Sequence, residues 1–238
     1  NRGLVTVSSV LTGPSVTPKR MDSMSASLYE YLDKQGVQAL VRIIQADDPF
    51  SGGVQLMTTY GLGTLVPNTV VVGASERAEA HAGFCRMLAE FHGAQRNALV
   101  IRYNPQRGFG AHRHIVVWWG GRKGNGALMV ILSWLLSTSL EWRGSTVTVK
   151  MAVPTEAAAV GARANLESIL HASRTGALAE VLVTGDRPFW ELIRESSSTA
   201  DLVFLGMAEP GADFEGYYAA LQERTLGLPT TVFTLAAE

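Results

Sequence analysis

A glycine-rich loop in the middle of the chain is the first place where the residue types could do chemistry. The segment Gly120–Gly126 (GGRKGNG) follows a short apolar run and opens a helix-length apolar stretch. Backbone N–H groups at such a helix start could cradle a phosphate, with the cations Arg122 and Lys123 assisting. The spacing fits neither a P-loop, which needs G-x-x-x-x-G-K and then Ser or Thr, nor a dinucleotide fingerprint, in which Met129 would be glycine or alanine. The sequence therefore predicts a tight turn that needs glycine torsions, with phosphate binding as the alternative.

Two histidines just before this unit could bind a metal. His112 and His114 are separated by one residue, so an extended backbone would place both imidazoles on one face. A third ligand such as His171 would have to be supplied by the fold. Neither a cysteine nor an acidic pair lies nearby, and we therefore predict no metal site.

None of the common catalytic arrangements is present in the sequence. It contains no nucleophile elbow, no H-E-x-x-H and no C-x-x-C. Asp47 and Asp48 are adjacent, so they point to different faces of an extended segment, and Asp before Pro49 more simply caps a helix. Ser75, after a strand that ends in glycine, also has the position of a helix N-cap. We expect no catalytic residue, no bound cofactor and no enzyme activity.

The composition is that of a folded globular chain. Of 238 residues, 47% are hydrophobic and 17% charged, which excludes a disordered or collagen-like chain. The formal net charge of -1 gives no bias toward nucleic acid, and we expect no nucleic-acid partner. Acidic residues are missing between Glu90 and Glu141, whereas the last third is acidic. This asymmetry favours either a docking surface or ordinary solvated faces.

The sequence contains one cysteine and no segment long enough to cross a membrane. Cys85 shares a helical stripe with Leu88 and Phe91, which predicts a buried structural thiol. The most apolar stretch, Ala127–Leu140, covers about 21 Å as a helix against the ~30 Å of a hydrocarbon core. It is apolar nearly all round, so we expect it deep inside the domain. The sequence begins with Asn1 and shows no signal peptide, so we expect an excised or processed piece.

Short β-branched runs alternate with helix-length segments along the whole chain. Helical stripes occur within Met24–Leu32, Val160–Leu170 and Phe214–Leu221. This alternation predicts an α/β fold with a mainly parallel sheet flanked by helices. The predicted strands are Leu4–Leu11, Ala39–Gln45, Thr69–Gly73, Ala98–Arg102, Ile115–Trp119, Thr146–Val153, Glu180–Val183, Leu202–Gly206 and Thr230–Leu235.

The chain also repeats its order of elements. Asp47–Phe50 and Asp186–Phe189 both read D-x-P-F after a strand, and each is followed by a helix and a strand that ends in glycine. Those glycines, Gly73 and Gly206, are 133 positions apart. We predict two related α/β lobes, residues 1–103 and 115–238, joined by a connecting segment at 104–114.

Four segments resemble, in order, the cytoplasmic C-terminal domain of cation-chloride cotransporters. The opening strand Gly3–Gly13 resembles that family's first strand, and Leu65–Gly73 (LVPNTVVVG) resembles its K-P-N-T, apolar, Gly segment. The run Val116–Trp142 resembles its V-W-W, glycine and apolar-helix unit, and Ala200–Met207 resembles its A-D-L strand. Two departures are a short segment in place of the family's long insertion and Leu226–Val232 where that family is rich in arginine and glycine.

The resemblance implies a fold like the universal stress proteins, with two lobes that are often dimeric. It implies a non-catalytic regulatory and dimerisation domain on the cytoplasmic side of the cell membrane, attached to a transmembrane transporter domain outside this chain. The expected partner is a second copy, as a homodimer. The alternative is a stand-alone nucleotide-binding protein of universal-stress type, in which Arg122 and Lys123 meet phosphates. The G-x-x-G pattern of nucleotide-binding members is missing, which favours the transporter domain.

Overall fold

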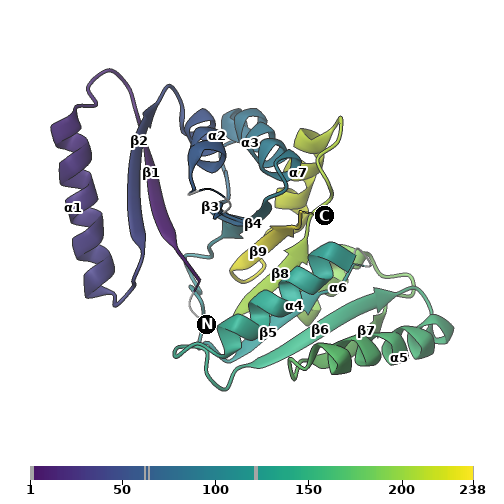
Figure 1. Ribbon diagram of the computed structural model, residues 1–238. Coiled ribbons are helices and arrows are strands. Elements are labelled where there is room, and N and C mark those ends of the chain that lie inside the picture. Colours follow the sequence, from purple (N-terminus) through teal and green to yellow (C-terminus); the bar gives the residue numbers. More distant parts are fainter. Residues whose placement is uncertain (1–2, 62, 64, 121–122, 238) are drawn as a thin grey trace. The chain divides into compact units, whose positions relative to one another are not determined.

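The computed structural model describes residues 3–61, 63, 65–120 and 123–237 (Figure 1). The chain divides into two compact units, Asn1–Pro67 and Asn68–Glu238. We describe each unit by itself.

The first unit is a two-stranded parallel sheet with two helices. It consists of β1 (Thr6–Thr12), α1 (Pro18–Lys34), β2 (Leu40–Ala46) and α2 (Pro49–Thr59). The side chain of Asp48 accepts hydrogen bonds from the backbone N–H groups of Phe50 and Ser51, and Pro49 begins α2. The predicted capping role of the Asp-Pro pair is therefore confirmed.

The second unit is built on a seven-stranded sheet with the order β3-β4-β9-β8-β5-β6-β7, which runs in Figure 1 from β3 and β4 near the centre to β7 at the lower right. Its elements are β3 (Thr69–Gly73), the 3₁₀ turn η1 (Ala78–Ala80), α3 (His81–Gly93), β4 (Asn97–Arg102), β5 (His114–Trp118), α4 (Lys123–Ser137), β6 (Thr146–Val153), α5 (Glu156–Ser173), β7 (Leu178–Val183), α6 (Phe189–Ser196), β8 (Leu202–Gly206), α7 (Phe214–Arg224) and β9 (Thr231–Leu235).

Neighbouring strands of this sheet run parallel except β4 and β9, which are antiparallel. The strand order reverses beside β5, which pairs with β6 on one side and with β8 on the other. The predicted α/β fold with a mainly parallel sheet flanked by helices is confirmed. All nine predicted strands are present, and β3, β6 and β8 have the predicted bounds.

The two compact units are not the same segments as the two lobes that we predicted from the sequence, and those lobes stay a prediction. Residues 104–114 connect β4 to β5, and both strands belong to the seven-stranded sheet. The reason is the antiparallel pairing of Ala98–Arg102 with Thr231–Leu235, which joins strands from both predicted lobes, 1–103 and 115–238. The division falls instead between Pro67 and Asn68.

The predicted repeat appears in the order of the elements. The series β1-α1-β2-α2-β3-α3-β4 has the same order as β6-α5-β7-α6-β8-α7-β9. β4 and β9 are the last strands of the two series, and they are the pair that runs antiparallel. Within the described residues, β5 and α4 have no counterpart in the first series.

Two layers of apolar side chains cover the seven-stranded sheet. On one face, α4 and α5 share a core with Leu99, Val117 and Phe204 from the strands. On the other face, α3 packs against α7, and the rings of Phe84 and Tyr218 lie 5.3 Å apart. The residues of the predicted Cys85 stripe are buried in this second layer. Burial raises the pKa of the Cys85 thiol to about 11, as expected for a structural cysteine.

Candidate functional site

The carboxyl edge of the sheet beside β5 and β8 is where an open α/β fold would bind a ligand. The side chain of Asn125, at the start of α4, lies buried at this edge. Its Nδ2 donates to the carbonyl of Met207 at 2.8 Å, and its Oδ1 accepts from the N–H of Ala236 at 2.7 Å. The amide therefore ties together the chain just after β8 and just after β9.

Close packing explains two glycines at the same edge. A Cβ on Gly126 would lie 2.7 Å from the indole of Trp119, and a Cβ on Gly206 would lie 3.1 Å from Asn125 Nδ2. Such distances would force the neighbouring groups apart. At these two glycines the edge is thus packed by the chain's own side chains. Arg122 and the side chain of Lys123 lie outside the described residues. Phosphate binding by this loop therefore stays a prediction from the sequence.

His112 and His114, the two histidines that were considered as metal ligands, lie in different surroundings. His112 adopts a left-handed backbone with φ of 56°, and its ring centroid lies 4.6 Å from that of Trp142. The Nε2 of His114 lies 3.2 Å from Thr148 Oγ1. Burial, followed by the charge of Lys150, lowers the pKa of His114. In the part of the chain that the structure describes, no three His, Cys, Asp or Glu residues are arranged to hold a metal.

A buried polar cluster that the sequence analysis missed joins side chains of β5 and β6 to the carboxyl end of α6. Lys150 Nζ donates to the carbonyl of Ser196 at 2.9 Å and to its hydroxyl at 2.7 Å, and lies 3.1 Å from a carboxylate oxygen of Glu180. The indole N–H of Trp118 donates to Ser197 Oγ at 2.9 Å. The ammonium group thus binds the carboxyl end of α6, where the helix dipole favours a cation. The signal in the sequence is a lone lysine within the apolar strand Thr146–Val153.

Asp201 organises the connecting segment. Its carboxylate accepts hydrogen bonds from the N–H groups of Ala111 at 3.0 Å, Arg113 at 2.7 Å and His114 at 3.0 Å. Burial alone would raise the pKa of this carboxyl, but the three backbone donors outweigh it and lower the pKa. A side chain on Gly110 would collide with the carboxylate, so the segment is folded tightly around it.

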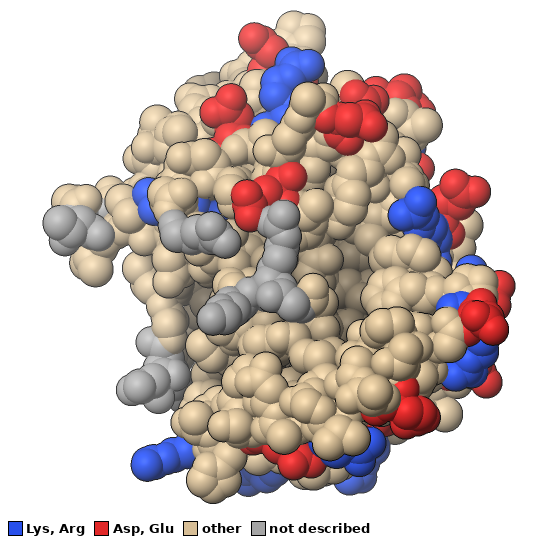
Figure 2. Space-filling view, turned by 90° about the vertical axis from the view of Figure 1, so that its right-hand side faces the viewer, with Lys and Arg blue, Asp and Glu red and all other residues tan. Residues whose placement is uncertain are grey.

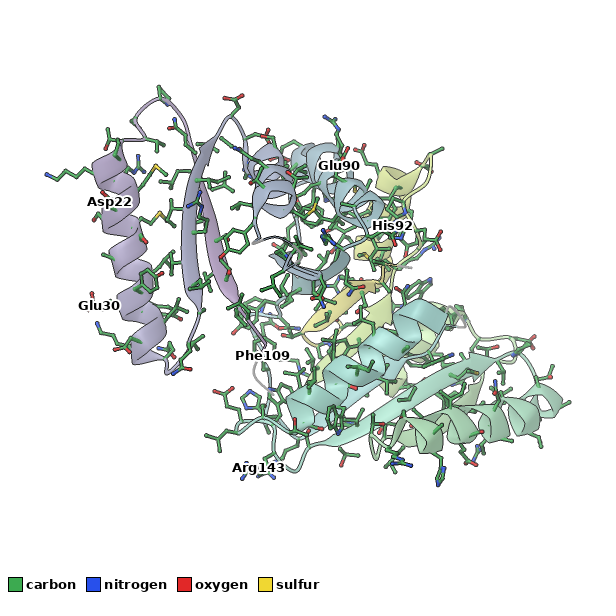
Figure 3. The ribbon with its side chains drawn as sticks, viewed as in Figure 1. Asp22, Glu30, Glu90, His92, Phe109 and Arg143 are labelled. Carbon is green, nitrogen blue, oxygen red and sulfur yellow. The ribbon has the colours of Figure 1, made fainter. Side chains whose placement is uncertain are left out.

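Aromatic rings cover the same segment. The ring of Phe109, labelled in Figure 3, lies 5.8 Å from that of Tyr103 and 6.4 Å from that of Trp142. Offset or edge-to-face aromatic pairs at these distances stabilise a fold beyond the area they bury. The segment 104–114, which connects β4 to β5, is therefore packed as part of the folded unit.

The antiparallel junction of β4 and β9 holds a partly buried arginine. The guanidinium of Arg102 donates to Thr225 Oγ1 at 2.7 Å, to the carbonyl of Gln222 at 3.3 Å and to the carbonyl of Thr225. It also lies 5.3 Å from the ring centroid of Phe233. Burial lowers its pKa. Arg102 thereby ties the last strand of the first series to the end of α7.

The predicted N-cap role of Ser75 is wrong. The helix that follows β3 begins later, at His81, with Ala80 as its cap. The backbone N–H of Ser75 instead donates to the hydroxyl of Tyr218 at 3.2 Å, and His81 Nε2 lies 3.1 Å from the carbonyl of Ser75. The backbone of Ser75 is thus bound to α7, and its side chain does not start α3.

The helix α4 is less buried than its sequence predicted. Ile131 is 51% exposed, Trp134 40% and Leu135 49%, and we call these three residues the α4 stripe. On β3, Val71 is 57% exposed. The three residues of the α4 stripe are spaced three and four positions apart, so they lie on one face of the helix.

Figure 2 shows another face of the molecule, seen from the right of Figure 1. Among the described residues visible there, acidic and basic side chains are interspersed along the margins, and the centre is mostly uncharged. The predicted charge asymmetry does not gather into a single-sign patch on this face. In the described ranges, no helix has both the length and the apolarity needed to cross a membrane.

Comparison with known proteins identifies the fold. No family model and no curated protein sequence matches the chain. The cytoplasmic domain of a prokaryotic cation chloride cotransporter is similar in structure, with a TM-score of 0.71 and 16% identity, over 99% of this chain and 85% of that one. A universal stress protein from Archaeoglobus fulgidus DSM 4304 gives 0.56 and 12%, over 99% and 88%. A putative universal stress protein from Pseudomonas aeruginosa UCBPP-PA14 gives 0.56 and 12%, over 95% and 81%. At these identities the comparisons show a universal-stress-like α/β fold.

Proposed function

We propose that this chain is a non-catalytic, cytoplasmic regulatory and dimerisation domain of a cation-chloride cotransporter. The observation that carries the proposal is the likeness to the cytoplasmic domain of such a transporter over 99% of the chain, at a TM-score of 0.71 against 0.56 for the universal stress proteins. The four segments that resemble this family lie in family order along the same chain.

The geometry of the sheet edge supports a scaffold rather than a nucleotide-binding protein. The place where a doubly wound sheet would take a ligand holds the bridging amide of Asn125 and the indole that packs on Gly126. The ties made by Lys150, Asp201 and Arg102 join separate elements of the unit. A rigid body of this kind can transmit a shift between two membrane-bound partners.

Membrane attachment and transport test the proposal most simply. The product of the complete reading frame, tagged at its carboxyl end, is expressed in cells and separated into membrane and aqueous fractions. We expect the product in the membrane fraction, chloride-dependent rubidium uptake, and a loss of that uptake when residues 68–237 are removed. A product of this size in the aqueous fraction, with no effect on uptake, would contradict the proposal.

Pairing of two copies is tested separately. In a symmetric dimer the same patch on both copies must be self-complementary. We expect sedimentation equilibrium of the membrane-attached protein in detergent to give a dimer, and a strict monomer at every concentration would refute the dimerisation role.

The second candidate function is a stand-alone nucleotide-binding protein, favoured by the likeness to universal stress proteins over 99% of the chain. Calorimetric titration of the chain with ATP separates the two functions. Saturable heat that disappears in the R122A/K123A double variant would favour the stress-protein function. No heat up to millimolar ATP is the result that the transporter function predicts.

A further inference from the structure

We propose that the groove between α5 and the free edge of β7 binds an extended peptide segment of another protein, which adds a strand to the sheet. The segment carries an acidic side chain that meets Arg174 and His171, and a basic side chain that meets Glu167. The inference goes beyond the proposed function and does not rest on it. Its four supports are a groove, unpaired backbone groups, the charges of α5 and the poor fit of a second copy.

The groove lies at the outer margin of the seven-stranded sheet, where Figure 1 shows β7 and α5 at the lower right. Its volume is about 740 Å³. The lining comes from Glu167 to Arg174 on α5 and from Gly176 to Ala179 at the start of β7. Of the described lining residues, none belongs to β6, so the groove lies on the side of β7 that is turned away from the sheet. Peptides that extend a sheet bind along such an edge strand.

The strand β7 offers unpaired backbone groups along this groove. It pairs with β6 alone in the described part of the chain, and the N–H of Thr184 donates to the carbonyl of Val153 at 2.8 Å. Successive residues of a strand direct their N–H and C=O groups to opposite sides, so those of Ala179 and Val181 point away from β6. No described residue bonds these four groups. The strand also lacks the proline or lysine that would block an added strand.

The wall of the groove on α5 carries charges of both signs. Glu167, His171 and Arg174 are spaced four and three positions apart, so they lie on one face of the helix, and all three are exposed. Among the described residues, no ion pair engages Glu167 or Arg174. Four helical residues rise about 6 Å, and a two-residue step along a strand covers about 6.6 Å. A segment with an acidic residue and, two positions away, a basic one therefore matches the charges of the wall.

A second copy of this chain fits the edge poorly. Pairing the four free groups of two copies would align Ala179 of one copy with Val181 of the other. The two Glu180 side chains would then lie directly opposite each other, where like charges destabilise a sheet. A carboxylate oxygen of Glu180 lies 3.1 Å from Lys150 Nζ, so turning it aside would remove the counter-charge of a buried ammonium group. The charges therefore favour a segment of a different protein as the occupant.

A fluorescence-anisotropy titration of the 238-residue chain with a labelled peptide tests the proposal. The probe is TVEVKVT, in which the acidic and basic residues are two positions apart and the β-branched residues favour an extended backbone. We expect saturable binding below about 1 mM. N-methylation of every second residue blocks the donors on one edge of the peptide. One of the two alternate sets should weaken binding at least about tenfold, and the other set should have a smaller effect.

The charge of Arg174 gives a second readout. We expect R174E to weaken the binding of TVEVKVT about fivefold, because an attractive pair becomes a repulsive one. The peptide TVKVKVT should bind R174E more tightly than it binds the unchanged chain. R163E is the matched control, since Arg163 is exposed on α5 but does not line the groove, and it should change neither affinity.

Three results would overturn the proposal. The first is no saturation with TVEVKVT up to about 1 mM. The second is equal affinity of R174E and the unchanged chain for both peptides, which would show that the contact lies elsewhere. The third is a dimer in sedimentation whose Ala179 and Val181 amides are protected from exchange without peptide, which would show that a second copy covers β7. Membrane attachment and ion uptake are not read here, so failure of this proposal is distinguishable from failure of the proposed function.

Discussion

β8 and β3 hold the same position in the two halves of the chain, and both are short apolar strands that end in glycine. β8 is buried along its whole apolar length, whereas β3 is partly exposed at each residue. The local sequence is alike, so the difference comes from the neighbours: among the described strands, β8 has one on each side and β3 has only β4. The comparison teaches that two apolar strands of similar sequence can differ in burial because of the number of strands that flank them.

Truncation of the equivalent side chains should give the largest difference between the halves. We expect F204A to lower the free energy of unfolding by about 4 kcal/mol, because a fully packed ring leaves a cavity. V71A in the same chain should cost about 0.5 kcal/mol or less, since the side chain is already in water. Urea unfolding of both variants measures the two losses in the free energy of unfolding. Equal losses would contradict the difference in burial between Phe204 and Val71.

Asn125 and Asn97, both at the sheet edge, should contribute differently to the free energy of unfolding. Asn125 is buried and bonds two backbone groups, so N125A should cost about 3 kcal/mol by leaving both unpaired. Asn97, on β4, accepts from the N–H of Ala237 at 2.8 Å but is only partly buried. N97A should therefore cost about 1 kcal/mol. The same unfolding series measures both, and a larger loss for N97A would contradict the bridging role of Asn125.

Two helical glycines should respond to alanine with opposite signs. G126A introduces a methyl group against the Trp119 ring and should destabilise the chain by about 1–3 kcal/mol. G161A in α5 meets nothing within 4 Å, so it should stabilise the chain by about 0.5–1 kcal/mol through its helix propensity. A stabilising effect of G126A would contradict the close packing of Gly126 against the Trp119 ring.

Acidification should weaken the connecting segment in two steps. The pKa of His114 is lowered in the folded chain, so its contribution is complete above the unfolded pKa of about 6.5 and is lost as the pH falls below that value. The pKa of Asp201 is also lowered, so its contribution is complete above about 3.9 and is lost at lower pH. We expect H114Q to flatten the stability profile between pH 7 and 5, and D201N to flatten it below pH 4. Profiles that keep their slopes would contradict these assignments.

The strands were largely predictable from the sequence, because apolar β-branched runs and glycine-ended junctions are local signals. The helix positions that are buried were harder to predict. The stripe predicted on α5 is confirmed at Leu166 and Leu170, which are buried, but Val160 faces water and the neighbouring Ala159 is buried in its place. One position along a helix turns a side chain by about 100°, so the prediction was wrong at this first residue of the stripe.

The polar ties could not be predicted because they join residues that are distant in sequence. Asp201 bonds backbone groups 87 to 90 residues away, and Asn125 bonds one group 82 and another 111 residues away. The antiparallel pairing of β4 with β9 could not be predicted for the same reason, because it leaves no local signal in the sequence. The expectation that α4 is buried nearly all round is wrong, because Ile131, Trp134 and Leu135 are exposed.

Hydrogen exchange at β3 and β8 tests the central claim most directly. In the 238-residue chain we expect the β3 amides on the edge away from β4 to exchange rapidly, while the β8 amides stay protected. Equal protection of the amides of β3 and β8 would contradict the account.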